Sequence, residues 1–354
     1  MSRFFSTKYA ALTPYTPGEQ PRERKYLKLN TNESPFPPSP VAQRLARQAA
    51  GDLQLYSDPT CHDLVAVAAE KLGVEKEEIL FTNGSDEILN FAFMAFCDEK
   101  HPAVFPDVTY GFYPVFAALN HVPYRTVPLR EDFTVDLADY EHAGGTIFLA
   151  NPNAPTGIAL KKSEIEHLLI TNPDNMVVVD EAYVDFGAES VLGLIGKYDN
   201  LLVCQTFSKS RSLAGARLGF GAACREVIRD LDTVKYSTNP YNVNRMTMAA
   251  GIGALSDEEY FRENCKKIAD AREYAAAELE KLGFTLTPSL SNFLFAKTPR
   301  LSGLALYEKL REKGVLIRHF ETDRLKDYNR ITVGSREQME EFIAAVRAVL
   351  EENK

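Results

Sequence analysis

Residues 205–217 read Gln205-Thr206-Phe207-Ser208-Lys209-Ser210-Arg211-Ser212-Leu213-Ala214-Gly215-Ala216-Arg217. The stretch begins at the end of an apolar run and places an amine beside a hydroxyl, with a guanidinium eight positions later (217 − 209 = 8). A lysine amine can bond covalently to an aldehyde, and a hydroxyl and a guanidinium can bind a phosphate. Ser208, Lys209 and Arg217 therefore suit a phosphorylated aldehyde.

Short apolar runs alternate with helical segments around this stretch. Strands are predicted for residues 103–105, 146–150, 176–180, 201–205 and 218–223, and helices such as 163–170 fall between them. Because parallel strands are usually joined by helical crossovers, the order predicts an α/β fold with a mostly parallel, doubly wound sheet and helices on both faces. Functional groups gather at the carboxyl ends of the strands in such sheets. No Gly-x-Gly-x-x-Gly turn is present, which disfavours a dinucleotide fold.

A second, smaller α/β domain is predicted from the C-terminal part of the chain. A charged helix over residues 257–282 leaves the large domain, and a helix at 303–313, strands near 315–317 and 330–333, and a last helix at 336–351 follow it. We expect a large domain of residues 31–256 and a small domain formed by residues 1–30 and 257–354.

A second stretch makes the interpretation of Lys209 more specific. It reads Val177-Val178-Val179-Asp180-Glu181-Ala182-Tyr183. Its β-branched residues predict a buried strand that ends in a carboxylate. Burying an unpaired carboxylate is expensive, so Asp180 needs a cationic partner. A protonated pyridine nitrogen is such a partner, and Tyr183 can offer its phenol to the ring oxygen of the same group. Together with the lysine, these residues point to pyridoxal phosphate.

A phosphate site is predicted upstream, in Thr82-Asn83-Gly84-Ser85-Asp86-Glu87, which leads into an apolar helix. Free backbone N–H groups of Gly84, Ser85 and Asp86 could surround a phosphate at the helix start, with Ser208 and Arg217 completing the site. Alone, each motif is more often a helix cap, a turn or a surface pair. Their order along one chain favours one cofactor site.

With these motifs, the chain resembles the fold-type I pyridoxal-phosphate aminotransferases and, within them, the histidinol-phosphate aminotransferases. The resemblance covers nearly the whole chain. Its motifs are Leu12-Thr13-Pro14-Tyr15, Leu29-Asn30-Thr31-Asn32-Glu33-Ser34-Pro35, Leu55-Tyr56, Asn83-Gly84-Ser85-Asp86-Glu87, Pro106-Asp107-Val108-Thr109-Tyr110-Gly111, Asp180-Glu181-Ala182-Tyr183, Ser208-Lys209, Arg217 and Arg330-Ile331-Thr332-Val333-Gly334.

The resemblance implies roles for the residues that face the cofactor. Lys209 is the residue that bonds to the cofactor and then shuttles a proton. Asp180 pairs the pyridine nitrogen, Tyr183 bonds the ring oxygen and Tyr110 stacks on the ring. Tyr56 is expected to reach the phosphate of the neighbouring subunit's cofactor, which implies a homodimer.

The resemblance also implies a set of substrate-binding residues. Arg330 looks like the arginine that binds the substrate carboxylate. Arg318 and Tyr15 look like contributors to the phosphate end of the substrate, and Asn32 belongs to the same set.

One position departs from the family pattern. The family usually has asparagine directly before Pro-Thr-Gly, bonding the ring oxygen, whereas this chain has Ala154 there and Asn153 one place earlier. Either Asn153 substitutes through a local backbone shift, or Tyr183 bonds that oxygen alone. The bond Ala154-Pro155 could be cis, because X-Pro bonds in tight turns adopt that form.

Composition narrows the class of protein. A net charge of −9 and a pI near 5.4 argue against a nucleic-acid or anionic-membrane partner. The five cysteines have no paired spacing and are expected to be free thiols, and no motif predicts a metal site. The N-terminal residues lack a long apolar core, so we expect a cytoplasmic protein.

The resemblance implies transfer of the amino group of L-histidinol phosphate to 2-oxoglutarate, giving imidazole-acetol phosphate and glutamate in histidine biosynthesis. Two enzyme alternatives stay open at this point. A threonine-phosphate decarboxylase would share the scaffold, and an aromatic amino-acid aminotransferase could use the same arginines. A cofactor-binding regulator would need an added DNA-binding segment, for which the sequence shows no basic module.

Overall fold

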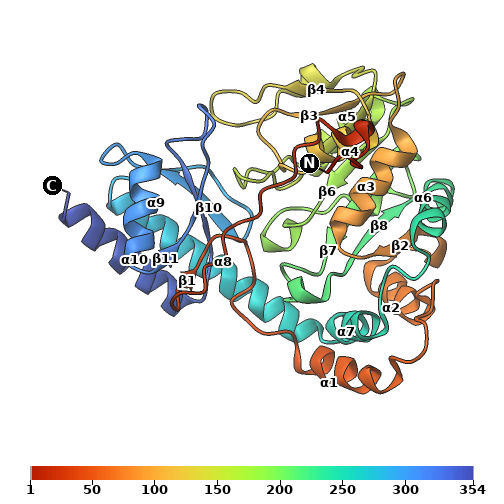
Figure 1. Ribbon diagram of the computed structural model, residues 1–354, viewed down its shortest axis with the longest axis horizontal. Helices are drawn as coiled ribbons and strands as arrows, with labels where there is room; N and C mark the ends of the chain where they lie inside the picture. Colours follow the sequence, from red (N-terminus) through yellow and green to blue (C-terminus); the bar gives the residue numbers. More distant parts are fainter. Residues whose placement is uncertain (1, 354) are drawn as a thin grey trace.

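The central sheet of the computed structural model, which describes residues 2–353, has seven strands in the order β2-β8-β7-β6-β5-β3-β4 (Figure 1). Strands β4, β3, β5, β6 and β7 are parallel, whereas β8 is antiparallel to both β2 and β7. The predicted mostly parallel sheet is therefore confirmed. The strands are β2 (Ile79–Thr82), β3 (Ala103–Pro106), β4 (Tyr124–Val127), β5 (Thr146–Ala150), β6 (Val177–Asp180), β7 (Leu201–Thr206) and β8 (Gly219–Ala223).

Strand β6 shows why this sheet is covered on both sides. Side chains alternate across a strand, and Val177 and Val179 pack into one apolar core while Val178 packs into another. All three are fully buried. The first core is covered by α1 (Pro40–Ala49), α2 (His62–Leu72), α5 (Lys162–Thr171) and α7 (Arg245–Ser256), and the second by α3 (Ser85–Phe96), α4 (Tyr113–Asn120) and α6 (Arg225–Thr238).

The C-terminal part of the chain builds a separate core together with residues near the N-terminus (Figure 1). Leu27 and Leu29 pack there with Ile268 and Phe342. A four-stranded antiparallel sheet has the order β12-β13-β10-β9, and β1 pairs in parallel with β11. The elements are β1 (Leu27–Lys28), α8 (Glu258–Lys281), β9 (Thr285–Leu286), β10 (Phe293–Lys297), α9 (Gly303–Glu312), β11 (Val315–Leu316), β12 (Arg318–His319), β13 (Asn329–Thr332) and α10 (Arg336–Glu351).

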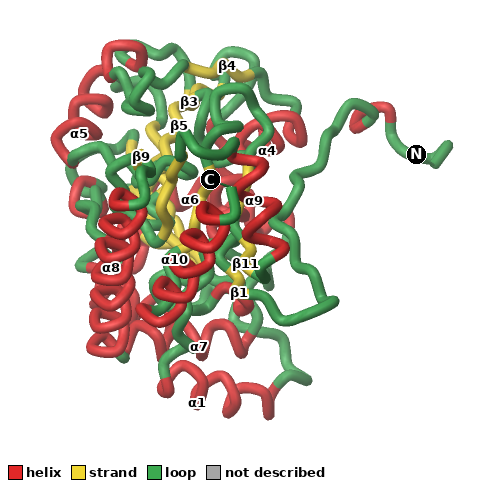
Figure 2. Tube along the Cα trace, turned by 90° about the vertical axis from the view of Figure 1, so that its left-hand side faces the viewer, coloured by secondary structure: helices red, strands yellow, loops and turns green. Residues whose placement is uncertain are grey.

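The predicted division into residues 31–256 and residues 1–30 with 257–354 stays a prediction, and its terminal residues Met1 and Lys354 lie outside the described residues. The segment before β1 is mostly loop and extends away from the sheets (Figure 2). None of the helices described between residues 2 and 353 has the length and apolarity needed to cross a membrane.

Helices α1 and α7 approach each other closely at Gly253. A Cβ added there would lie 2.5 Å from Ala42 Cα and 2.6 Å from Ala42 N. Because the colliding atoms belong to the backbone of α1, we expect Gly253→Ala to reduce the free energy of unfolding by roughly 1–3 kcal/mol, despite the better helix propensity of alanine. Urea denaturation would measure this loss. Gly196→Ala is the control, since nothing lies within 4 Å of its added Cβ, and equal stability of the two variants would contradict the packing argument.

Candidate active site

The carboxyl ends of the parallel strands β5, β6 and β7 open into a pocket of about 270 Å³. Ala150, Asp180 and Thr206 are the strand-end residues in its wall. This is the edge of the sheet where the sequence predicted functional groups. The lining residues are Thr31, Glu33, Ser85, Asp86, Tyr110, Ala150, Ala154, Asp180, Ala182, Tyr183, Thr206, Ser208, Lys209, Ala214 and Arg217.

Asp180 ends β6 as a buried carboxylate that faces the pocket. Its Oδ1 accepts a hydrogen bond from Ala182 N at 3.1 Å, and its Oδ2 accepts one from the Tyr113 hydroxyl at 3.4 Å. Burial raises the pKa of Asp180 to about 7, although these hydrogen bonds oppose the shift. Lys209 favours the charged form, but no cation within residues 2–353 forms an ion pair with Asp180, and a protonated pyridine nitrogen would supply one.

Glu181 is buried as well, but its carboxylate is enclosed by hydrogen-bond donors outside the pocket. Ser190 Oγ and Val191 N donate to it at 2.6 Å, and Gln205 Nε2 donates at 2.8 Å. Burial raises the pKa of Glu181 to about 7. Of the two neighbouring carboxylates, only Asp180 lines the pocket.

The predicted phosphate site forms at the first turn of α3. Gly84 is the residue before the helix and has φ 81°, and a Cβ added there would lie 2.5 Å from Arg217 Nη2. Arg217 pairs with Asp86 at 3.1 Å, and its Nη1 donates to Ser208 Oγ at 3.5 Å. The Gly84 N–H is not free, because it donates to the Thr82 carbonyl at 2.9 Å. The first residues of α3, Ser85 and Asp86, line the pocket together with the Ser208 hydroxyl and the Arg217 guanidinium, a combination of donors suited to a phosphate.

Lys209 reaches the pocket from the loop after β7. Its Nζ donates to the Thr31 carbonyl at 3.4 Å and lies 5.8 Å from the centre of the Tyr183 ring. Asn32 Nδ2 donates to the Tyr183 hydroxyl at 3.0 Å, while Asn32 Oδ1 accepts from Thr332 at 3.0 Å. The lysine and the tyrosine therefore lie beside the same segment. Asn32 contacts Tyr183 and is not among the lining residues.

Tyr110 also lines the pocket. Its hydroxyl donates to Asp86 Oδ1 at 2.8 Å, and burial raises the pKa of this phenol well above its ordinary value. Its ring packs edge-on against Tyr113. A neutral aromatic side chain held in this way could stack on a planar cofactor ring.

Asn153 requires a correction, because the structure does not bring it into this pocket. Its Nδ2 donates to the Val108 carbonyl at 3.0 Å and to Thr156 Oγ1 at 3.1 Å, and it lines a different cavity. Both Asn151-Pro152 and Ala154-Pro155 are cis, and Ala154 takes the position at the pocket wall. The geometry favours the alternative in which Tyr183 bonds the ring oxygen alone.

Arg318 and Arg330 are direct partners in the antiparallel pair β12–β13. Their hydrogen bonds run to backbone carbonyls, from Arg330 to Asn30 at 3.1 Å and from Arg318 to Thr16 at 3.4 Å. Neither guanidinium forms an ion pair with a carboxylate within residues 2–353. Burial lowers the pKa of Arg330, whose Nε is buried without a hydrogen-bond partner. Two facing cations repel each other, so the pair suits an anionic ligand.

Tyr15 and Tyr56 do not line the pocket of their own chain. Tyr15 stacks on Phe112 with ring centres 4.3 Å apart and precedes Thr16, which accepts the hydrogen bond from Arg318. Tyr56 is 81% exposed. The structure thus brings Tyr15 near the arginine pair and leaves Tyr56 on the surface.

Several residues of the site were missed from the sequence. Tyr113 supports Asp180, and Thr31, Glu33 and Thr206 line the pocket. Thr31 and Glu33 flank Asn32 in the motif of residues 29–35. The hydrogen bond from Lys209 to Thr31 is a long-range contact that no local sequence pattern reveals. Tyr113 begins a helix, where an aromatic residue is ordinarily read as part of the core.

The family described as "Aminotransferase class I and II" matches residues 24–346. The chain belongs to this family. It is 45% identical to a histidinol-phosphate aminotransferase of Brachyspira hyodysenteriae over 99% of each chain, and 48% identical to one of Syntrophus aciditrophicus over 97% of each. The solved structure of the histidinol-phosphate aminotransferase from Sinorhizobium meliloti in complex with pyridoxal-5'-phosphate is similar with a TM-score of 0.90, 26% identity and 99% coverage of both chains.

The pocket of this aminotransferase fits pyridoxal phosphate at both ends. Asp180 offers a buried carboxylate to the ring nitrogen, and Arg217, with the start of α3, offers donors to the phosphate. Lys209 lines the same pocket. Gly84 has φ 81°, a backbone conformation that residues with a side chain rarely adopt, and Arg217 lies close to the same position.

The buried carboxyls predict how the stability of the cofactor-free protein depends on pH. Because the unfolded state loses these protons near pH 4 and the folded state retains them until about pH 7, the free energy of unfolding should fall as pH rises across this window. The linkage slope is about 1.4 kcal/mol per pH unit for each carboxyl. Asp180→Asn should remove the contribution of Asp180 to this pH dependence of the free energy of unfolding, as measured by denaturation at pH 5, 6 and 7. The same pH dependence in both proteins would contradict the assignment.

Proposed function

We propose that this aminotransferase transfers the amino group of L-histidinol phosphate to 2-oxoglutarate, giving imidazole-acetol phosphate and L-glutamate in histidine biosynthesis. The observation that carries the proposal is the facing pair Arg318 and Arg330, which has no carboxylate partner within residues 2–353. Neither arginine lines the pocket, but Arg330 donates to the carbonyl of Asn30, which directly precedes the pocket-lining Thr31. The full-length relatives named histidinol-phosphate aminotransferase support the choice of substrate.

Lys209, Asp180 and Tyr183 are proposed as the catalytic residues. When bound, pyridoxal phosphate supplies an electron sink next to the substrate Cα. Lys209 would hold the cofactor through its Nζ, and the same Nζ, when free, would act as the general base for the substrate Cα proton. Asp180 stays ionised beside the protonated ring nitrogen, and Tyr183, oriented by Asn32, donates to the ring oxygen.

The remaining cofactor contacts are proposed from their positions in the pocket wall. Tyr110 stacks on the ring, and the phosphate binds to the groups that meet at the start of α3. Those phosphate-binding groups are Gly84, Ser85, Asp86, Ser208 and Arg217.

The substrates themselves call for two cationic positions. Histidinol phosphate carries a phosphate and no carboxylate, whereas 2-oxoglutarate carries two carboxylates, so one site has to accept both kinds of anion in turn. We assign a carboxylate of the keto acid to Arg330, and the phosphate end of histidinol phosphate to Arg318 and Tyr15. A guanidinium serves both tasks because its planar fork matches carboxylate and phosphate oxygens.

We further propose a cytoplasmic homodimer in which Tyr56 binds the phosphate of the cofactor in the partner subunit. The 81% exposure of Tyr56 and its absence from the pocket of its own chain support a role across an interface. The division into a large domain of residues 31–256 and a small domain of residues 1–30 and 257–354 belongs to the same proposal. The division is supported by one core that lies wholly within residues 31–256 and a second that is built mostly from residues 1–30 and 257–354 and also includes Ala154, Tyr183 and Phe186.

A half-reaction with different amino donors tests which substrate the protein prefers. Histidinol phosphate, phenylalanine or glutamate is added separately to the cofactor-loaded protein, and loss of the absorbance of the lysine-bound cofactor is followed. We expect the fastest conversion with histidinol phosphate, because its phosphate can bind the arginine pair. Faster conversion with phenylalanine would make the protein an aromatic aminotransferase, and no conversion would favour a decarboxylase or another donor. Lys209→Ala should abolish this absorbance.

The arginine pair gives a second prediction. Arg330→Lys keeps the charge and loses the planar fork, so kcat/KM for 2-oxoglutarate should fall by about 10- to 100-fold, as expected for loss of charged hydrogen bonds worth roughly 1.5–3 kcal/mol. Steady-state kinetics with varied 2-oxoglutarate would measure this change. Arg300→Lys is a matched control, since Arg300 donates to the Leu350 carbonyl of α10. A fall of the same size in the control would show a general effect on the small domain instead.

A further inference from the structure

The segment of residues 53–61, here called the Tyr56 loop, joins the end of the α1 region to α2. Three of its large apolar side chains are exposed: Leu53 by 56%, Leu55 by 59% and Tyr56 by 81%. Its second half is folded by its own hydrogen bonds, since Asp58 accepts from the backbone N–H groups of Thr60 and His62 at 2.9 and 2.8 Å. Where this folded segment lies relative to the rest of the subunit depends on the residues outside the loop that bind its backbone.

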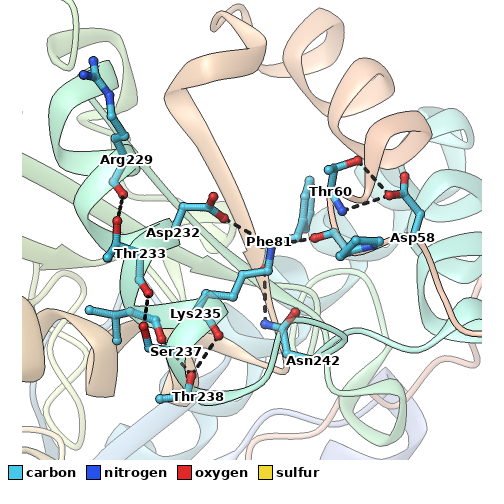
Figure 3. Close-up of polar contacts among 12 residues, drawn as sticks. Asp58, Thr60, Phe81, Arg229, Asp232, Thr233, Lys235, Ser237, Thr238 and Asn242 are labelled. Atoms are coloured by element: carbon cyan, nitrogen blue, oxygen red, sulfur yellow. Dashed lines mark hydrogen bonds and ion pairs between the residues drawn. The ribbon is translucent and has the colours of Figure 1, made fainter.

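Lys235 of α6 is one of these residues. It is 2% exposed, yet its Nζ donates to the Pro59 carbonyl at 2.6 Å and lies 3.3 Å from Asp232 Oδ1. Figure 3 shows the side chain extending from α6 between Asp232 and the segment that carries Asp58 and Thr60. A buried ammonium is costly unless its hydrogen bonds are made, so the position of the Pro59 carbonyl is closely constrained.

Two further contacts hold the other half of the loop. Arg245, at the start of α7, donates through Nη2 to the Tyr56 carbonyl at 2.7 Å. The Tyr56 ring stacks on Tyr241, with ring centres 4.6 Å apart. Two cationic side chains, Lys235 and Arg245, therefore bind backbone carbonyls of the loop that are three residues apart (59 − 56 = 3). Both of them, and Tyr241, lie within residues 235–245.

Beyond the loop, the same segment of the chain reaches the phosphate region. Asn242, next to Tyr241, donates to Glu87 Oε2 at 2.6 Å, and that oxygen accepts from Asn83 N at 2.7 Å (Figure 3 includes Asn242). Residues 235–245 therefore connect the Tyr56 loop to the residues that precede α3 in the same subunit.

We propose that Lys235 is a positioning residue that sets the Tyr56 loop for the active site of the other subunit. It acts through the Pro59 carbonyl and touches neither cofactor nor substrate. The inference rests on the proposed homodimer and on the proposed role of Tyr56. Its distinctive consequence is that loss of Lys235 harms the site of the partner subunit and leaves the site of its own subunit intact.

Lys235→Met tests this, because methionine keeps an apolar stem of similar length and removes the donors. In the homodimer, the cofactor dissociation constant should rise about tenfold, the size expected when a charged hydrogen bond to phosphate is lost. The measurement is the absorbance of the lysine-bound cofactor during titration. Lys197→Met, which removes an exposed lysine paired with Glu166, is the control and should leave the constant unchanged.

Hybrid dimers decide where Lys235 acts. A dimer of one Lys235→Met subunit and one Lys209→Ala subunit has a single site that can bond the cofactor, and this site receives Tyr56 from the subunit with intact Lys235. We expect that site to bind cofactor as tightly as the site in a hybrid of wild type and Lys209→Ala. A site as weak as in the Lys235→Met homodimer, or a homodimer with unchanged affinity, would overturn the proposal.

Tyr56→Phe in the same two dimers tests the underlying role of Tyr56 separately. Unchanged affinity in the Tyr56→Phe homodimer would refute the proposed phosphate contact, whereas a weakened homodimer with a restored hybrid would support it. If Lys235→Met does not yield folded protein, Arg245→Met removes the second cation from the loop. The same weakened homodimer and restored hybrid are expected for it, and their absence would overturn the proposal.

Discussion

The burial of one carboxylate at the end of β6 is the constraint on which the site depends. Asp180 lies among apolar strands that are covered on both faces, where ionisation is unfavourable and the pKa rises to about 7. A cation at this point relieves the cost, and the ring nitrogen of pyridoxal phosphate is suited to the task. The neighbouring Glu181 is equally buried but fully enclosed by donors. The two carboxyls have similarly raised pKa values, and what distinguishes Asp180 is that it lines the pocket and Glu181 does not.

The site is also a junction between parts of the chain that are distant in sequence. Asn32 connects Tyr183, after β6, with Thr332 of β13, so the phenol is held by segments that flank both sheets. Lys209 donates to the backbone of the same N-terminal segment. Arg330 of β13 donates to the Asn30 carbonyl in that segment as well, although neither it nor Arg318 lines the pocket. A change in one sheet can therefore alter groups that belong to the other.

Much of this could be predicted because it depends on local chemistry. Apolar runs predicted five strands of the central sheet, β3, β5, β6, β7 and β8, to within one residue at each end, and the order of Gly84, Asp180, Lys209 and Arg217 predicted the cofactor. The strands that were not predicted include β2 and β4 of the same sheet, β4 being mostly exposed, and β1, β9 and β12, which have two residues each. Asn153 was misplaced because a side chain one position away from the expected one points to a different cavity. Its direction follows from a backbone path that no pattern of side chains specifies.

The amino-acid sequence by itself determined the fold class, the family and the residue types that meet the cofactor, since periodicity and short motifs are local properties of the chain. Only the tertiary structure decided which of these residues line the same pocket. It also decided that Arg318 and Arg330 are paired across β12 and β13, and that the buried Lys235 binds the backbone of the Tyr56 loop. These contacts join residues separated by 12 to 176 positions. Their existence depends on packing of the whole chain, because a contact between distant residues forms only when the intervening elements have found their places.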